Sequence, residues 1–326
     1  MKTQAIIIHE YGGPEVLRWE EVEVGEPGPG QVRVRHGAVG LNYIDVYHRT
    51  GLYPLASLPS GIGLEGAGVV EAVGEGVEEI KPGDRVAYAS PPPGAYAQLR
   101  LMPADRLVPL PDAVDDQQAA AMMLQGMTAQ YLLRRTHRVQ AGETLLVHAA
   151  AGGVGLILCQ WARHLGATVI GTVGSEEKAE LAKVNGCQYP IIYTREDFVT
   201  RVREITNGEG VAVVYDSVGK DTFMPSLDCL RPLGMMVSFG NASGAVPAFE
   251  PAILSQKGSL FLTRPTLMTY NAKRTDLLDS ARELFRVVEE GAVRIQVNQT
   301  YPLAETARAH RDLEARRTTG STVLLP

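Results

Sequence analysis

The 326-residue sequence contains only three cysteines, Cys159, Cys187 and Cys229. They form no close pair and show no spacing typical of a zinc site, and an odd number cannot all pair within one chain. We therefore expect buried free thiols rather than a disulfide framework, as is usual for proteins of the reducing cytosol.

Long hydrophobic runs and an excess of positive charge are also missing. No apolar stretch reaches the roughly 20 residues that a membrane-spanning helix needs, and the apolar part of the N-terminal segment is too short for a signal peptide. The net charge of −6 gives no overall attraction for nucleic acid or for anionic membranes. These absences predict a cytoplasmic protein without a membrane partner, and they argue against nucleic acid as a partner.

Two regions of the chain differ in their hydrophobic pattern. Residues 1–124 show short β-branched segments broken by glycine and proline, which is typical of a small, partly open β-barrel. From residue 125 on, strand candidates alternate with helix-length segments, as parallel strands require. The strand candidates are 144–148, 167–173, 189–192, 211–215, 235–239 and 259–263. The pattern predicts a doubly wound parallel sheet over 125–264. We expect the tail, 265–326, which includes a strand-like segment at 293–297, to return to the first domain.

The segment HAAAGGVG, residues 148–155, lies between the first of these strands and a helix-like stretch. It resembles the dinucleotide-binding turn G-x-G-x-x-G, except that Ala150 stands at the first glycine position. Gly152 and Gly153 would let the backbone approach a pyrophosphate, and Gly155 would let the helix pack closely on the strand. Because the position of Ala150 requires only a small residue, we interpret the segment as a phosphate-binding turn at a helix N-terminus. The alternative is a tight turn without a ligand.

The end of the second strand bears on the choice between NAD and NADP. An NAD site has an acidic residue about 20 residues after the glycine turn, which accepts hydrogen bonds from the ribose 2′-hydroxyl. The corresponding segment here, GTVGS at 171–175, has none. Ser175 can cap the next helix while Lys178 points towards a 2′-phosphate, and the helix dipole alone explains Glu176 and Glu177. We predict NADPH as the cofactor; the alternative for Lys178 is a solvated surface position.

Several motifs resemble the quinone oxidoreductase/ζ-crystallin branch of the medium-chain dehydrogenase/reductase superfamily, which is free of zinc. These motifs lie at 42–47, 51–53, 63–68, 81–85, 142–163, 215–219 and 237–241. The likeness covers essentially the whole chain and is greatest to bacterial NADPH:quinone oxidoreductases. It implies an α/β fold with a GroES-like β-barrel catalytic domain, residues 1–124 and 265–326, and a Rossmann NADPH-binding domain, residues 125–264.

The resemblance also implies the residues of the site. Nucleotide contacts are implied at Asn42, Thr128, Gly152, Gly153, Val154, Lys178, Tyr193, Ser217, Phe239, Gly240 and Arg316. Of these, Lys178, Tyr193 and Arg316 would surround the 2′-phosphate. The quinone pocket would be lined by Asn42, Asp45, Tyr47 and Tyr53. For each tyrosine the alternative is a place in the core or at its rim.

The zinc-dependent dehydrogenases of the same superfamily hold a catalytic metal with a cysteine, the histidine of a Gly-His-Glu motif and a further acid or cysteine. Asn42 and Leu64 occupy the first two of these positions here, and no cysteine lies between residues 88 and 105, where those enzymes carry a four-cysteine lobe. Amide and aliphatic side chains do not replace thiolate and imidazole as zinc ligands. The seven histidines show no ligand spacing either, so we predict that the protein holds no metal.

Without zinc, no Lewis acid polarises a carbonyl or lowers the pKa of an alcohol, which argues against alcohol oxidation. A quinone is a strong acceptor and needs less help. Positioning of the nicotinamide against a flat acceptor would then supply most of the rate, and no single side chain would be indispensable. We therefore predict metal-free, NADPH-dependent reduction of quinones by electron or hydride transfer.

Two other functions stay open at this point. A zinc-free enoyl or enone reductase would need a proton donor over the α-carbon of its substrate, such as Tyr47 or Tyr53. A non-catalytic NADPH-binding protein with a structural or RNA-binding role is supported only by the basic cluster at 134–138, which a solvated helix end explains as well. The resemblance also implies a homodimer joined through the edge strand near 259–263.

Overall fold

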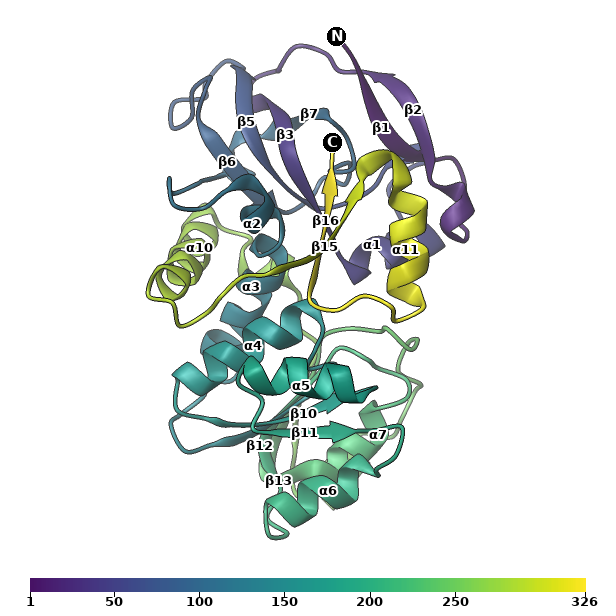
Figure 1. The fold of residues 1–326 in the computed structure, drawn as a ribbon, viewed down its shortest axis with the longest axis vertical. Helices are drawn as coiled ribbons and strands as arrows, with labels where there is room; N and C mark the ends of the chain where they lie inside the picture. Colours follow the sequence, from purple (N-terminus) through teal and green to yellow (C-terminus); the bar gives the residue numbers. More distant parts are fainter. The chain divides into compact units, whose positions relative to one another are not determined.

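The computed structural model describes residues 1–326 and divides them into two compact units. Unit 1 comprises Met1–Gln125, Lys273–Ala281 and Ile295–Pro326, and unit 2 comprises Gly126–Ala272 and Arg282–Arg294. Unit 1 is built on largely antiparallel sheets and unit 2 on a parallel sheet with helices on both faces (Figure 1). The predicted α/β class, with two differently built parts, is confirmed. The domain limits inferred from the sequence stay a prediction.

Unit 1 contains two sheets. The smaller has the order β2-β1-β4, with β1 (Lys2–Ile8), β2 (Arg18–Glu23) and β4 (Ser60–Gly61). The larger runs β15-β16-β3-β5-β6-β8, with β7 also paired to β3. Its strands are β3 (Gln31–Leu41), β5 (Glu65–Val73), β6 (Arg85–Ala89), β7 (Leu99–Pro103), β8 (Val108–Pro109), β15 (Val297–Pro302) and β16 (Ser321–Leu325). The helical segments of unit 1 are η1 (Pro14–Val16), α1 (Tyr43–Thr50), η2 (Ala104–Arg106), α2 (Asp116–Ala120), η5 (Leu303–Glu305) and α11 (Thr306–Glu314).

Strand β3 is central to the larger sheet, because it pairs antiparallel with β5, β7 and β16. Its side chains Val32, Val34 and Val39 are fully buried in the core of unit 1. The register between β3 and β5 shifts twice, and such bulges bend a sheet as a barrel requires. A side chain at Gly68 would overlap the Arg35 carbonyl oxygen, so this close approach of β5 to β3 requires glycine.

Unit 2 is built on a six-stranded parallel sheet in the order β11-β10-β9-β12-β13-β14. The strands are β9 (Thr144–Val147), β10 (Thr168–Val173), β11 (Tyr189–Ile192), β12 (Val211–Asp216), β13 (Leu230–Ser238) and β14 (Phe261–Thr263). The helical segments are η3 (Leu132–Thr136), α4 (Gly153–His164), α5 (Glu176–Val184), α6 (Phe198–Ile205), α7 (Phe223–Ser226), η4 (Leu227–Cys229), α8 (Ala252–Gln256) and α9 (Leu267–Tyr270). Two longer helices, α3 (Met123–Tyr131) and α10 (Arg274–Glu289), contribute residues to both units.

The parallel sheet has the strand order of a dinucleotide-binding fold. Numbered along the chain, its strands lie in the order 3-2-1-4-5-6, and the direction of winding reverses between β9 and β12. Helices α4 and α5 lie on one face, whereas Val202 of α6 and Phe223 of α7 pack with Ile170 of β10 on the other (Figure 1). In such sheets ligands bind beyond the carboxyl ends of the strands at this reversal point.

The six strands expected from the sequence are confirmed, with small differences in their limits. Strand β13 begins at Leu230 rather than near 235. Leu233, with a φ of 62°, and Gly234 interrupt the strand pattern, so the sequence did not indicate the first half of this strand. The strand expected at 293–297 is wrong, because β15 begins only at Val297. Val293 is buried, but its N–H donates to the Val287 carbonyl oxygen and closes the end of α10 instead.

The three cysteines are free and buried, as expected. All of them lie in unit 2. None of the helices is long and apolar enough to cross a membrane.

Candidate functional site

The turn after β9 packs backbone and small side chains very closely. Ala149 has a φ of 53°, in the left-handed region that non-glycine residues rarely adopt. A side chain at Gly155 would overlap the Ala149 carbonyl oxygen, so α4 can approach the turn only with glycine there. Ala150 is fully buried and its N–H donates to the Thr172 carbonyl oxygen at 3.1 Å. The packing therefore accommodates alanine beside the second strand, where a Cβ built on Gly171 would lie 2.6 Å from the Ala150 Cβ.

Helix α4 begins at Gly153 and has Gly152 as its N-cap, without a capping side chain. Its first turn contains no acidic residue. The N–H groups of a first helical turn have no intrahelical acceptor, and the helix dipole gives them a partial positive charge. Gly153 and Val154 therefore present backbone donors of the kind that a pyrophosphate requires, whereas the Gly152 N–H already donates to the Ala149 carbonyl oxygen at 2.9 Å.

The edge of the sheet beyond β10 and β11 brings together the two residues predicted for a 2′-phosphate in this unit. Ser175 caps α5, and its Oγ accepts the Lys178 N–H at 3.3 Å. A Cβ built on Gly174 would lie 3.0 Å from the Tyr193 hydroxyl, and the Tyr193 N–H donates to the Val173 carbonyl oxygen. Lys178 and Tyr193 thus follow neighbouring strand ends.

The acidic residues beside this edge, Glu176 and Glu177, interact with other side chains of the protein. Glu176 forms an exposed ion pair with Arg195, with an Oε1–Nη1 distance of 2.6 Å. The Ser175 hydroxyl lowers the pKa of the Glu177 carboxyl. No acidic residue stands on the last residues of β10 itself, which are Gly171, Thr172 and Val173.

The turns after β12 and β13 are fastened to each other by a residue that sequence reasoning did not single out. Asp216, the last residue of β12, is fully buried, and its Oδ1 accepts the N–H groups of Val218 and Gly219 at 2.8 and 3.1 Å. Its carbonyl oxygen accepts the Phe239 N–H at 2.8 Å. A side chain at Gly240 would overlap the carbonyl oxygen of Ser217, the residue after Asp216. The predicted contacts Ser217, Phe239 and Gly240 therefore form one compact group.

His148 is a second residue whose role was missed. Its ring nitrogens lie 2.9 Å from Thr172 Oγ1 and 2.8 Å from Ser226 Oγ, and burial lowers the pKa of the imidazole. The neutral ring, with a hydrogen bond at each nitrogen, links the end of β9 to β10 and α7. Thr128, the remaining nucleotide residue predicted in this unit, lies buried in α3.

In unit 1, Asn42 is held by two partners that the sequence did not reveal. Its amide nitrogen donates to Glu65 Oε2 at 2.6 Å, and its amide oxygen accepts from Gln125 Nε2 at 3.2 Å. Glu65 is fully buried, and burial raises the pKa of its carboxyl to about 8. Its other oxygen accepts the Leu124 N–H at 2.7 Å. Both polar atoms of the Asn42 side chain are thereby fixed.

These residues do not fit a zinc ion. The amide of Asn42 already donates to Glu65, and Leu64 presents only a buried aliphatic side chain. Nowhere in the chain do three histidine, cysteine or acidic side chains lie in an arrangement suited to a metal ion. An amide, an aliphatic group and one buried carboxyl lack the nitrogen and sulfur donors that zinc prefers.

Asp45 is fully buried near the start of α1. Its Oδ2 accepts the Asn42 N–H at 2.9 Å and the Tyr96 hydroxyl at 2.7 Å, whereas its Oδ1 is buried with no hydrogen-bond partner. Burial raises the pKa of the carboxyl to about 7, against the lowering effect of these two hydrogen bonds. One oxygen of Asp45 thus holds the helix start, and the other is unsatisfied.

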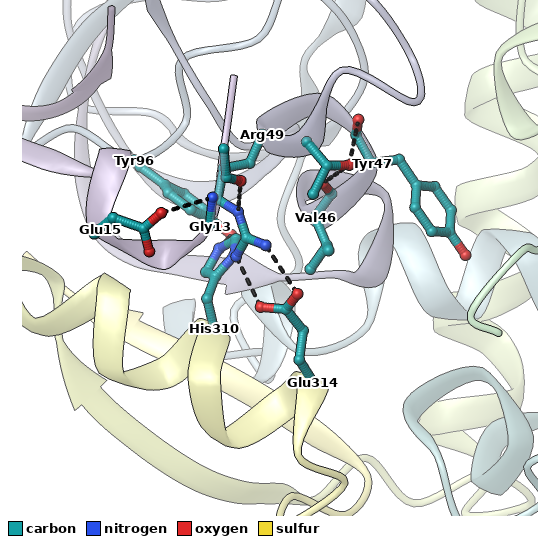
Figure 2. A network of polar contacts seen from close by, with 10 residues as sticks. Gly13, Glu15, Val46, Tyr47, Arg49, Tyr96, His310 and Glu314 are labelled. Carbon is teal, nitrogen blue, oxygen red and sulfur yellow. Dashed lines mark hydrogen bonds and ion pairs between the residues drawn. The ribbon is translucent and has the colours of Figure 1, made fainter. Parts of the chain in front are cut away.

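Tyr47 and Tyr53 lie against each other, with ring centroids 5.0 Å apart in an edge-on arrangement. Tyr43 lies 5.5 Å from Tyr47 and extends the group by a third ring. Figure 2 shows the Tyr47 ring turned away from Arg49 and His310, on the other side of α1. The helix therefore separates an aromatic face from a buried polar face.

The polar face contains Arg49, which sequence reasoning also missed (Figure 2). Its guanidinium donates to both carboxylate oxygens of Glu314 at 2.8 Å and to His310 Nδ1 at 3.0 Å. Arg316 follows shortly after Glu314 with a φ of 59°, where its N–H donates to the Leu313 carbonyl oxygen and ends α11.

The predicted site residues therefore fall into two groups. Asn42, Asp45, Tyr47, Tyr53 and Arg316 belong to unit 1, and the other nucleotide residues belong to unit 2. Asp45, Glu65 and Tyr96 gain partners from segments distant in sequence, whereas the Asp216 carboxylate binds N–H groups two and three residues further along the chain. The sequence signal that could have drawn attention to Glu65 is its position as a single acidic residue within the otherwise apolar segment 62–70.

Comparisons with known proteins assign both parts of the chain to known families. Residues 28–112 match the family of the alcohol dehydrogenase GroES-like domain, and residues 153–281 match the zinc-binding dehydrogenase family. A quinone oxidoreductase of Pseudomonas aeruginosa is 58% identical, with 97% of each chain covered. A 2-haloacrylate reductase of a Burkholderia species is 52% identical, with 99% of each chain covered.

A solved structure extends the likeness to three dimensions. The crystal structure of Escherichia coli quinone oxidoreductase complexed with NADPH matches with a TM-score of 0.97 and 50% identity, covering 99% of this chain and all of the other. Identity and coverage of this order show that the chain belongs to the quinone oxidoreductase family of the medium-chain dehydrogenase/reductase superfamily.

Proposed function

We propose that the protein is an enzyme that reduces quinones with NADPH and without a metal. The observation that carries the proposal is the sheet edge formed by Ser175, Lys178 and Tyr193, where β10 ends without an acidic residue. A cation and a hydroxyl at this edge suit a 2′-phosphate, whereas an NAD site would place a carboxylate there. A relative that is 50% identical over nearly its whole length was crystallised with NADPH.

The residues of unit 2 would hold the nucleotide. The N–H groups of Gly153 and Val154 fit the pyrophosphate, and Gly152, without a side chain, would let it approach the turn. The compact turns that contain Ser217 and Gly240 lie beyond the adjacent strand ends. Thr128 and Phe239 complete the contacts proposed for this unit, and the nucleotide contacts proposed for Asn42 and Arg316 would come from unit 1. When bound, NADPH supplies a hydride to the acceptor.

The residues of unit 1 would hold the acceptor. The aromatic face of α1, with Tyr47 and Tyr53 edge to face, suits a flat ring held by stacking and a few hydrogen bonds. Asn42, fixed by Glu65 and Gln125, would supply a polar group beside this face, and the buried Asp45 carboxyl accepts the Asn42 N–H from below the surface. The donors around Asn42 do not fit zinc, so orientation of the reactants would supply most of the rate.

One relative favours a second candidate. The Burkholderia protein, 52% identical, is named a 2-haloacrylate reductase, and a haloacrylate is an α,β-unsaturated acid. Reduction of activated double bonds by the same site is therefore the alternative to quinone reduction. It differs in requiring a proton donor at the α-carbon, for which a tyrosine hydroxyl of α1 or of the loop after it is the candidate.

An RNA-binding role has less support. Of the basic cluster at 134–138, Arg134 pairs with Glu283 at 3.4 Å, and Arg135 donates to the Tyr270 carbonyl oxygen at 2.8 Å and lies over the Tyr270 ring. These contacts engage the cluster within unit 2 rather than leaving it to a phosphate backbone.

We also propose a homodimer, located in the cytoplasm. Strand β14 is the edge of the parallel sheet, and Phe261 and Leu262 are 57% and 37% exposed on it. An exposed apolar edge strand favours pairing with a second copy. Buried free thiols are typical of a reducing compartment.

Anaerobic mixing of the protein with NADPH and para-benzoquinone tests the proposed function. We expect each NADPH oxidised to yield one hydroquinone, and we expect NADH to replace NADPH poorly. Hydroquinone formation at the rate of a protein-free control, together with tight NADPH binding, would instead favour a non-catalytic role.

A further inference from the structure

A buried chain of hydrogen bonds in unit 1 runs from Arg49 to Asp45. Arg49 Nη1 lies 3.0 Å from His310 Nδ1, His310 Nε2 lies 3.2 Å from the Tyr96 hydroxyl, and this hydroxyl lies 2.7 Å from Asp45 Oδ2. All four side chains are buried. Figure 2 shows Arg49, His310 and Tyr96 converging from α1, α11 and the segment before β7.

Arg49 fixes the direction of this chain. A guanidinium has only donors and stays protonated, so His310 Nδ1 must accept from Arg49. Burial and the positive charge of Arg49 lower the pKa of His310 to about 3, which keeps the ring neutral. The single ring proton therefore lies on Nε2 and is donated to the Tyr96 oxygen.

The direction continues to the carboxyl group. Because the Tyr96 oxygen accepts from His310, its own hydrogen is donated to Asp45 Oδ2. Oδ2 also accepts the Asn42 N–H, so two donors already point at this oxygen. A proton on Oδ2 would face both of them, whereas Oδ1 is buried without a partner.

We propose that Arg49, acting through His310 and Tyr96, is a positioning residue for Asp45. It keeps Oδ2 as a hydrogen-bond acceptor and thereby confines protonation of this carboxyl to Oδ1. This chain of hydrogen bonds thus determines which oxygen of Asp45 carries the proton. Arg49 itself remains bound to Glu314 on its outer side.

The titratable and charged groups around Asp45 come from four elements. They are Tyr96 before β7, Glu65 on β5, His310 on α11 and Arg49 on α1 itself. Burial raises the pKa of Asp45 to about 7, and the Tyr96 hydrogen bond opposes this rise. Loss of the Tyr96 hydroxyl must therefore raise the pKa further.

A consequence for catalysis rests on the proposed function. Hydride transfer to a quinone creates an anion, and a neutral Asp45, buried next to Asn42, does not repel it. The rate should therefore fall as the pH rises through the pKa of Asp45, and the Tyr96→Phe variant should move this fall to higher pH.

Nitrogen-15 NMR of the histidine-labelled, unmodified protein tests the direction of the chain without any assay of activity. We expect His310 as the Nε2–H tautomer, neutral at pH 7. His36 is a matched internal control, because its Nδ1 lies 2.6 Å from the Ala97 carbonyl oxygen and must carry the proton. Opposite tautomers for the two buried rings would support the proposal. An Nδ1–H tautomer or an imidazolium at His310 would overturn it.

Infrared titration of the carboxyl groups tests the proton on Asp45. The acid C=O band that disappears in Asp45→Asn should titrate, in Tyr96→Phe, about 1–2 pH units above its position in the unmodified protein. Tyr88→Phe is the control, because Tyr88 is an equally buried tyrosine that binds His36 and lies outside the chain. An unshifted band in Tyr96→Phe, or an equal shift in Tyr88→Phe, would contradict the proposal. Neither spectroscopic result depends on quinone turnover, so a failure of the proposed function would be seen separately.

Discussion

Arg49 and Glu314 form a bidentate ion pair, with Nη1–Oε2 and Nη2–Oε1 distances of 2.8 Å each. The Arg49 side chain is 1% exposed and the Glu314 side chain 33% exposed. The pair joins α1, which carries Asp45 and Tyr47, to the end of α11, which leads to Arg316. This one ion pair therefore connects the two segments of unit 1 that carry predicted site residues.

Removal of Glu314 should destabilise unit 1. The Glu314→Ala variant leaves a buried guanidinium without its carboxylate, which should cost about 3 kcal/mol of unfolding free energy. Urea unfolding followed by Trp19 fluorescence in a Trp161→Phe background measures this in unit 1. Glu21→Ala is the control, because the Lys2–Glu21 pair has a similar distance of 2.7 Å but is 66% and 51% exposed. Its loss should cost less than about 1 kcal/mol. Equal costs for the two variants would show that burial does not strengthen the pair.

Replacement of Lys178 should change the choice of cofactor. Lys178→Ala should weaken NADPH relative to NADH by about 1.5–3 kcal/mol, roughly 10- to 150-fold in kcat/KM, because a charge-assisted contact to the 2′-phosphate is lost. Lys183→Ala, at the exposed end of the same helix, should leave the ratio unchanged. If the unmodified protein used both cofactors with equal efficiency, the assignment of this edge to a 2′-phosphate would be wrong.

Activity should not depend on a metal. The Asn42 amide is engaged by Glu65 and Gln125, and Leu64 cannot ligate, so purified protein should contain far less than one zinc per chain. Metal analysis by mass spectrometry and an assay after prolonged chelation check this, with a zinc-dependent alcohol dehydrogenase treated in parallel. Stoichiometric zinc that is lost together with activity would refute it.

The tyrosine hydroxyls should contribute little to quinone reduction. Tyr47→Phe and Tyr53→Phe keep both rings of the edge-on pair, so each should lower kcat with a quinone by less than roughly tenfold. General acid catalysis would typically contribute about 10²–10⁴-fold. A loss in that larger range, measured in steady state at saturating NADPH, would assign a proton-donating role to the hydroxyl.

The sequence predicted the fold well where local patterns repeat. The six strands of unit 2 and the turn at 148–155 follow from alternating strand and helix lengths and from small residues at a strand end. The strand expected at 293–297 failed because apolar alternation there serves the end of α10, where Val293 is bonded to Val287. Local periodicity does not distinguish these two uses of buried valines.

The candidate site was predictable in its exposed and backbone parts but not in its buried polar contacts. Lys178, Tyr193 and the glycines carry recognisable positions, and the structure brings Lys178 and Tyr193 to neighbouring strand ends. Arg49 and His310 are 261 residues apart in the chain, and Asp45 and Tyr96 are 51 apart. Such partners come together only in the folded protein, so their spacing in the sequence does not indicate that they are in contact.

The central claim is that the site transfers reducing equivalents from NADPH to quinones in preference to other acceptors. The most direct test compares kcat/KM at saturating NADPH for a series of quinones with that for 2-haloacrylates and cyclic enones. We predict that the best quinone exceeds the best activated alkene by at least tenfold, with small effects of Tyr47→Phe and Tyr53→Phe on the quinone reaction. A higher kcat/KM for the alkenes, lost on removal of a tyrosine hydroxyl, would contradict the account and identify the protein as a reductase of activated double bonds.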